Sequence, residues 1–168
     1  MATADANRDI SAANGARITA EAASWNGTPY ALVGSKSTKG EKGGGDCSGT
    51  TWLIYSAAGF QYEYQTSKSF PENALKRGLF REVAAGDAKQ DGDILWWNDH
   101  MAIYSTFMSP AETKFKTTAR KNKNGASWTQ TNDMWTASHP GGLPFRPAAI
   151  RYFGKEMAPR FFRWVGAK

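Results

Sequence analysis

The chain has 168 residues, 40% of them hydrophobic and 13% aromatic, which is enough apolar material for a folded domain and excludes a disordered chain. We expect a single domain over residues 1–168. Lys and Arg number 21 against 15 Asp and Glu, and the net charge of +6 favours a polyanionic partner such as nucleic acid or a cell-wall polymer. The same charge fits a basic surface that only keeps the protein soluble. Since no apolar run approaches the ~20 residues that span a bilayer, we expect no membrane insertion.

The first predicted element is a weakly amphipathic helix over residues 8–24, in which Gly15 is unfavourable. A turn at residues 26–29 (Asn-Gly-Thr-Pro) follows it, and a polar, glycine-rich loop covers residues 35–45. This loop lacks the glycine, lysine and serine or threonine spacing of a phosphate-binding loop, so a bound nucleotide is not expected.

A second helix is predicted over residues 47–58, because Asp46 is a favourable N-cap and Gly59 stands where helices commonly end in left-handed geometry. A short third helix is predicted over residues 71–77, opened by a proline and stopped by Gly78. Four side chains of the second helix are expected to face the core: Trp52, Leu53, Ile54 and Ala57.

After the helices the hydrophobic pattern becomes alternating, which predicts strands. The expected strands cover about residues 79–84, 93–97, 100–107, 133–138 and 160–165. Residues 98 and 99 (Asn-Asp) are expected to join the second and third strands as a tight hairpin. Helices followed by an antiparallel meander predict an α+β fold with the helices packed on the sheet.

Cys47 is the only cysteine and there are two histidines, so no internal disulfide can form and the Cys/His clusters of a structural zinc site are missing. No metal and no cofactor are therefore expected. Cys47 is either a small buried hydrophobe or a nucleophile. The two roles predict opposite reactivity of the thiol.

The predicted place of Cys47 in the first turn of a helix favours the nucleophile, because backbone N–H groups and the helix dipole there stabilise a thiolate. The same N–H groups are suited to receive the oxyanion that forms when sulfur attacks a carbonyl. An adjacent carboxylate disfavours a thiolate, but as N-cap Asp46 is expected to be engaged by the N–H groups of Ser48 or Gly49. We expect Asp46 to position the helix and not to act as a base.

His100 is the candidate general base. It starts a predicted strand, where it shares one face with Ala102 and Tyr104. Met101 and Ile103 then occupy the other face. A cysteine on a helix packed over such a strand would form a thiolate–imidazolium pair, in which histidine takes the thiol proton and returns it to the leaving amine.

Five short segments stand in an order that is typical of one enzyme family. They are residues 27–30 (Gly-Thr-Pro-Tyr), 46–49 (Asp-Cys-Ser-Gly), Gly59, 91–95 (Asp-Gly-Asp-Ile-Leu) and 100–104 (His-Met-Ala-Ile-Tyr). This order resembles that of the NlpC-type papain-like cysteine peptidases, which cleave peptidoglycan stem peptides. The resemblance covers roughly residues 25–105 and implies a papain-like fold and a thiol hydrolase. It implies Cys47 as nucleophile and His100 as base.

The resemblance also implies a third catalytic residue, commonly another histidine, that orients the first. By register Thr136 stands at that position, whereas His139, three residues further on, is the chemically better orienting group. We place His139 first and Thr136 second, although an exposed turn histidine describes His139 equally well. Asp99 and Asp133 are further alternatives. Tyr30 is implied to lie near the thiol, where its hydroxyl supports the oxyanion.

The connection over residues 105–132 is long and basic, which fits a mobile lid beside the cleft and fits a packed surface insertion equally well. Trp128 and Trp135 offer flat apolar surfaces to a sugar or peptide. The residues expected to bind the substrate are Tyr30, Asp46, Ser48 and Trp135.

No stretch of the sequence has the features of an export signal, yet a peptidoglycan hydrolase must reach the cell wall. The chain therefore resembles amidase effectors that are made in the cytoplasm and injected by type VI secretion into the periplasm of rival bacteria. Such effectors usually have an immunity protein that occludes the cleft. A phage endolysin is a similar alternative. The resemblance implies hydrolysis of an amide bond in the peptide stem, D-Glu to diaminopimelate being the family's usual bond.

Three other classes of protein are alternatives to this one. CHAP-type amidases share the order of cysteine before histidine and differ mainly in the bond cut. Acyltransferases of the lecithin-retinol type generally have histidine first, which argues against them. A noncatalytic module for nucleic acid or wall polymer would leave Cys47 inert. We expect the enzyme, a monomer that takes a peptidoglycan stem peptide and has no nucleic-acid partner.

Overall fold

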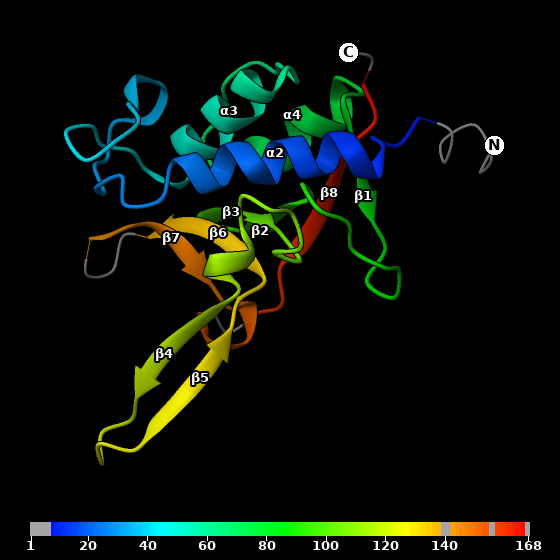
Figure 1. Cartoon of the computed structure of the whole chain (residues 1–168). Helices are drawn as coiled ribbons and strands as arrows, with labels where there is room; N and C mark the ends of the chain where they lie inside the picture. The colour runs from blue at the N-terminus through cyan, green and yellow to red at the C-terminus, as the bar shows by residue number, and fades with distance from the viewer. Residues whose placement is uncertain (1–7, 139–141, 155–156, 167–168) are drawn as a thin grey trace.

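The computed structural model describes residues 8–138, 142–154 and 157–166. Within these ranges the fold is α+β, as expected: the α-helices lie over one face of a six-stranded antiparallel sheet, and a two-stranded hairpin extends away from the opposite side (Figure 1). The helices are α2 (Ala12–Ser24), α3 (Cys47–Ala58) and α4 (Phe70–Lys76). The strands are β1 (Phe80–Val83), β2 (Ile94–Trp97), β3 (His100–Tyr104), β4 (Thr117–Lys121), β5 (Ser127–Thr131), β6 (Met134–Ser138), β7 (Leu143–Ala148) and β8 (Arg160–Trp164). None of the helices in the described ranges is long and apolar enough to cross a membrane.

Helix α2 begins after Ser11, whose hydroxyl accepts the N–H of Asn14 at 3.1 Å. Gly15 is buried in the contact between this helix and the segment before β2. A Cβ atom at Gly15 would lie 2.2 Å from the main-chain oxygen of Asp91. The glycine that weakens the helical pattern is therefore what lets the helix approach the sheet closely.

Helix α3 has the predicted bounds, from Cys47 to Ala58, and ends at Gly59 with a φ of 100°. Its core-facing side is only partly the predicted one. Ile54 is fully buried, but Ala57 is exposed and Trp52 and Leu53 are half-buried. Polar residues take part of the buried side: Thr50 and Thr51 are buried there, their hydroxyls donating to the carbonyls of Asp46 (2.7 Å) and Cys47 (2.8 Å).

The sheet has the strand order β1-β8-β2-β3-β6-β7. All five predicted strands are present, and the predicted hairpin pairs Trp97 with His100. The expected simple meander is wrong, however, because the C-terminal strand β8 inserts between β1 and β2 and pairs with both. Arg163 on β8 donates to both carboxylate oxygens of the buried Asp93, at 2.9 and 2.8 Å, which fixes β8 beside the start of β2.

Three strands were not predicted. Strands β4 and β5 form the projecting hairpin, and most of their side chains are exposed, so their sequence lacks the alternation of a half-buried strand. Strand β7 lies at the edge of the sheet and contains Pro144 and Pro147, which are tolerated there because an edge strand leaves main-chain positions unpaired.

The sheet separates two apolar clusters. Met101 and Ile103 belong to the cluster on the helix side. Ala102 belongs to the smaller cluster on the other side, which we call the far face. The predicted alternation along β3 is confirmed, and this decides how the candidate site is arranged.

Candidate active site

Cys47 is the first residue of α3, and its side chain is partly exposed. The preceding N-cap, Asp46, is buried and uses both carboxylate oxygens. Oδ1 accepts the N–H of Gly49 at 2.9 Å, and Oδ2 accepts the N–H of Gly34 at 2.8 Å. Asp46 thus ties the loop before α3 to the first turn of the helix. The expected positioning role fits these contacts, whereas the expected contact with substrate does not, because the carboxylate is buried and engaged.

The thiol of Cys47 is not the ionised group that the helix terminus suggested. Its pKa is raised to about 11, mainly because the side chain is removed from water. The backbone N–H of Met101 acts in the opposite direction, and the negative charge of Asp46 raises the pKa further. Backbone N–H groups therefore favour the thiolate as argued, but the loss of hydration outweighs them. At pH 7 the resting group is a neutral thiol.

Met101 places Cys47 near one end of strand β3, because Cys47 packs against the helix-side cluster to which Met101 belongs. The backbone N–H of Met101, which directly follows His100 in the chain, lies close enough to the thiol to favour the thiolate. The helix terminus that carries Cys47 and the strand that begins at His100 are therefore adjacent.

His100 is buried, and Thr136 on the neighbouring part of β6 holds its ring. Thr136 Oγ1 lies 2.7 Å from His100 Nε2 and 3.1 Å from the carbonyl oxygen of Met101. Which atom donates in the contact with Nε2 depends on the tautomer of the imidazole. In either tautomer this contact orients the ring with Nε2 toward Thr136.

The imidazole lies against aromatic rings of the far face. Its centroid is 4.6 Å from that of Phe153 and 5.6 Å from that of Trp97. Trp97 and Phe153 belong to the far-face cluster, whereas Cys47 packs against the cluster on the helix side. The two candidate catalytic side chains therefore approach the end of β3 from opposite faces of the sheet.

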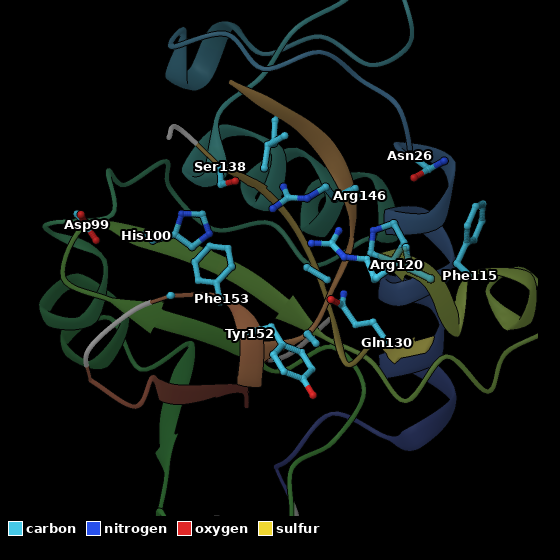
Figure 2. A pocket seen from close by; sticks show the side chains of 16 residues that line it. Asn26, Asp99, His100, Phe115, Arg120, Gln130, Ser138, Arg146, Tyr152 and Phe153 are labelled. Atoms are coloured by element: carbon cyan, nitrogen blue, oxygen red, sulfur yellow. The ribbon is translucent and has the colours of Figure 1, made fainter. Parts of the chain in front are cut away.

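A cavity of about 760 Å³ lies beside His100 (Figure 2). Its walls come from the base of the β4–β5 hairpin, from β7, and from the short helix η3 (Ile150–Tyr152) with the residues after it. In Figure 2 the ring of His100 lies beside Phe153, and Arg146 and Arg120 lie on the side of His100 that is away from Asp99. Cys47 is not among the described residues that line the cavity.

Thr136, the second candidate for the third catalytic position, is the described residue that bonds His100 Nε2. His139, which was placed first, lies outside the described residues. Asp133 has another role: Oδ1 accepts the N–H of Ile150 at 2.8 Å, which anchors η3.

Two tyrosines lie close to Cys47. Tyr30 is expected there, and its pKa is raised first by burial and then by the charge of Asp46 and that of the ionised Cys47 thiolate. Tyr64 was not predicted, yet burial raises its pKa first and the same two charges add to this, and its hydroxyl lies 2.9 Å from the hydroxyl of Ser48. Ser48 is thus buried and engaged. No motif pointed to Tyr64, because it stands in an irregular segment outside the resembling region's five matched pieces.

Trp135 does not face a substrate. It is fully buried in the helix-side core, stacked on Phe145, and its Nε1–H donates to Glu112 at 2.8 Å. The expected substrate contact of Trp135 is therefore wrong as the protein stands. Trp128 on the hairpin instead packs edge-to-face on Tyr152, with ring centroids 5.0 Å apart, so it joins the hairpin to the cavity wall.

In the three described ranges, no three His, Cys, Asp or Glu side chains form a group that could hold a metal ion. The amino-acid sequence matches no protein-family model, and no curated protein matches it significantly. The chemistry of the site must therefore be argued from the geometry and from the resemblance of the short motifs.

Proposed function

We propose that the protein is a cysteine peptidase or amidase that hydrolyses an amide bond in peptidoglycan stem peptides. The observation that carries the proposal is the packing of Cys47 beside Met101, because it brings a helix N-terminus bearing the only cysteine of the sequence next to the strand that begins at His100. The order of motifs around these residues supports the class of substrate.

The proposed reaction starts from the neutral thiol. His100 Nδ1 takes the thiol proton as the sulfur attacks the carbonyl carbon, because a thiol with a pKa of about 11 is not ionised beforehand. The backbone N–H groups at the start of α3 stabilise the oxyanion. The imidazolium then gives its proton to the leaving amine, and a thioester remains on Cys47. Water, deprotonated by His100, cleaves the thioester and restores the thiol and a carboxylic acid product.

Thr136 serves this reaction by orienting the imidazole with Nε2 toward its hydroxyl. A threonine, unlike a carboxylate, adds no charge, so the imidazolium is stabilised less than in a triad with an acid. We propose D-Glu to diaminopimelate as the bond that is cut. An effector delivered to the periplasm of a target cell, with an immunity protein as partner, is the proposed setting; a phage endolysin or a CHAP-type amidase is the alternative.

The proposal is tested on purified sacculi. Wild-type protein is expected to release new amino groups, and mass spectrometry of the soluble fragments is expected to identify the stem bond that was cut. Cys47→Ala should release none, with circular dichroism showing that the variant is folded. Wild-type protein that releases no new amine from sacculi of several stem types would contradict the proposal.

One observation favours a second function, noncatalytic binding of an anionic wall polymer or peptide. The cavity of about 760 Å³ is lined by His100 but, among the described residues, not by Cys47. If binding were the only function, Cys47→Ala would bind sacculi as tightly as wild type and neither protein would release fragments. The same sacculus experiment, with a pull-down of the protein, separates the two functions.

A further inference from the structure

The wall of the cavity near the hairpin carries two arginines. Arg120 comes from β4 and Arg146 from β7, and Figure 2 shows the two guanidinium groups side by side. The pKa of Arg146 is lowered, first by burial and then by the positive charge of Arg120. The two cations are thus held near enough to repel each other.

Elsewhere in the molecule arginines pair with carboxylates: Arg81 with Asp9, Arg160 with Glu82, and Arg163 with Asp93. In the part of the chain that the structure describes, neither Arg120 nor Arg146 has such a partner. With the described residues Arg146 makes two long hydrogen bonds, to the carbonyls of Thr136 (3.5 Å) and Pro144 (3.4 Å). Arg146 is half-buried and Arg120 is exposed. Two adjacent cations, one of them partly desolvated and neither paired with a described carboxylate, favour an anion between them.

The rest of the lining defines what else the ligand carries. Phe115, Tyr152 and Phe153 present aromatic surface to the cavity, and Gln130 beside Arg120 presents an amide. A volume of about 760 Å³ lies in the range of small-ligand sites, roughly 300–1,000 Å³, and is too small for a nucleic-acid duplex. Asp99 stands on the opposite side, beyond His100, so the arginine end is where an anionic group is expected.

We propose that this cavity binds a short peptide through a carboxylate that Arg120 and Arg146 hold, while the aromatic side chains contact the peptide's apolar part. Planar guanidinium groups bind carboxylates through paired hydrogen bonds, which gives both affinity and orientation. That the peptide is a peptidoglycan stem rests on the proposed function. The carboxylate site itself does not depend on catalysis.

The test measures equilibrium binding by isothermal titration calorimetry at fixed ionic strength, with Cys47→Ala protein so that no turnover occurs. The probes are a soluble stem tetrapeptide and the same peptide with its carboxylates amidated. The acidic peptide is expected to bind at least about tenfold more tightly than the amidated one, because hydrogen bonds between charged groups contribute about 1.5–3 kcal/mol. Because this comparison uses two peptides and one protein, its result does not depend on whether any arginine variant folds.

Variants then test whether the carboxylate binds at the two arginines. Arg120→Gln and Arg146→Gln, each added to Cys47→Ala, are expected to lower the affinity for the acidic peptide about tenfold and to leave the affinity for the amidated peptide unchanged. Lys121→Gln is the matched control, because Lys121 is the exposed neighbour of Arg120 on β4 and does not line the cavity. Equal binding of the two peptides would overturn the carboxylate site. An equal loss in Lys121→Gln would overturn it as well, because general basic charge would then explain the affinity.

The peptide-binding experiment can fail or succeed independently of the sacculus experiment that tests the proposed function. If wild-type protein cuts sacculi while the two peptides bind equally, the proposed hydrolase activity is supported and the carboxylate site is overturned. If both arginines are needed for tighter binding of the acidic peptide while wild-type protein cuts no sacculi, the carboxylate site is supported and the proposed hydrolase activity is contradicted.

Discussion

The ionisation of a single sulfur decides how the proposed reaction begins. The first turn of α3 supplies the N–H groups that favour a thiolate, but burial and the charge of Asp46 leave the pKa of Cys47 at about 11. A preformed ion pair with His100 is then not the resting state. The base must act at the moment of attack, which makes the position of the imidazole more important than its charge.

Alkylation of Cys47 tests this pKa directly. With a pKa of about 11 the thiolate fraction at pH 7 is about 10⁻⁴, so iodoacetamide should react about 100-fold more slowly than with an ordinary thiol. Because the pKa is raised, the rate should rise about tenfold for each pH unit and continue rising above pH 9. Intact mass against time measures it. A rate that levels off below pH 8 would mean that the thiol is activated after all.

Thr136→Val removes the hydroxyl that holds His100 Nε2. We expect kcat on sacculus fragments to fall about tenfold, and the free energy of unfolding to fall by about 1–3 kcal/mol because two buried groups lose a partner. Thr136→Ser keeps the hydroxyl and should therefore retain most of the wild-type kcat and most of the wild-type free energy of unfolding. If Thr136→Val keeps wild-type kcat, Thr136 does not orient the base.

At the residue scale the sequence predicted some contacts of the candidate site and missed others. Register placed Thr136 beside His100, and the structure has the two side chains in contact, whereas His139, the first choice, lies outside the described residues. The raised pKa, the burial of Trp135 and the proximity of Tyr64 to Cys47 could not be predicted. They depend on how segments far apart in the chain pack, and a local pattern does not carry that information.

The start of α3 shows how a cap acts on the helix and the thiol at once. Asp46→Ala leaves the N–H groups of Gly49 and Gly34 without their acceptor and should lower the free energy of unfolding by about 1–2 kcal/mol in urea titrations. Asp46→Asn keeps an acceptor oxygen and should lower the free energy of unfolding by less than Asp46→Ala does. Both remove the charge that raises the pKa of Cys47, so both should alkylate faster than wild type at pH 8. Unchanged alkylation in Asp46→Asn would contradict the assigned influence of the carboxylate.

Helix α2 provides a substitution whose effect opposes its helix propensity. Gly15→Ala should gain about 1 kcal/mol from propensity, yet the added Cβ would meet the main-chain oxygen of Asp91 at 2.2 Å, and overpacking of this kind costs about 1–3 kcal/mol. We therefore expect net destabilisation. Ala13→Gly, on the exposed side of the same helix, should destabilise by propensity alone. A more stable Gly15→Ala would show that the helix does not pack as closely as described.

Elements with strong end signals were predicted, and those without them were missed. Asp46 and Gly59 fix both ends of α3, whereas the polar hairpin β4–β5 has no buried face to mark it, and the prolines of β7 argue against a strand. The position of β8 between β1 and β2 could not be predicted from local patterns, because it depends on partners such as Arg163 and Asp93 that lie far apart in the sequence.

In the whole molecule, one sheet separates the thiol from the cavity. Cys47 lies with the helices, the arginine-lined cavity lies on the far face, and His100 at the end of β3 is the residue that borders the cavity and adjoins the cysteine through Met101. For the proposed reaction, His100 must therefore exchange a proton with the thiol across the end of β3. A role confined to the far face would make it a wall of the binding site alone.

The most direct test is the activity of Cys47→Ala, His100→Ala and the double variant on a purified stem peptide, measured as kcat/KM. Residues that act as one unit give single variants no more active than the double variant. The account predicts that all three proteins share the same residual activity, at the level of buffer. A His100→Ala protein that keeps wild-type kcat/KM while Cys47→Ala loses it would contradict the pairing of these two side chains.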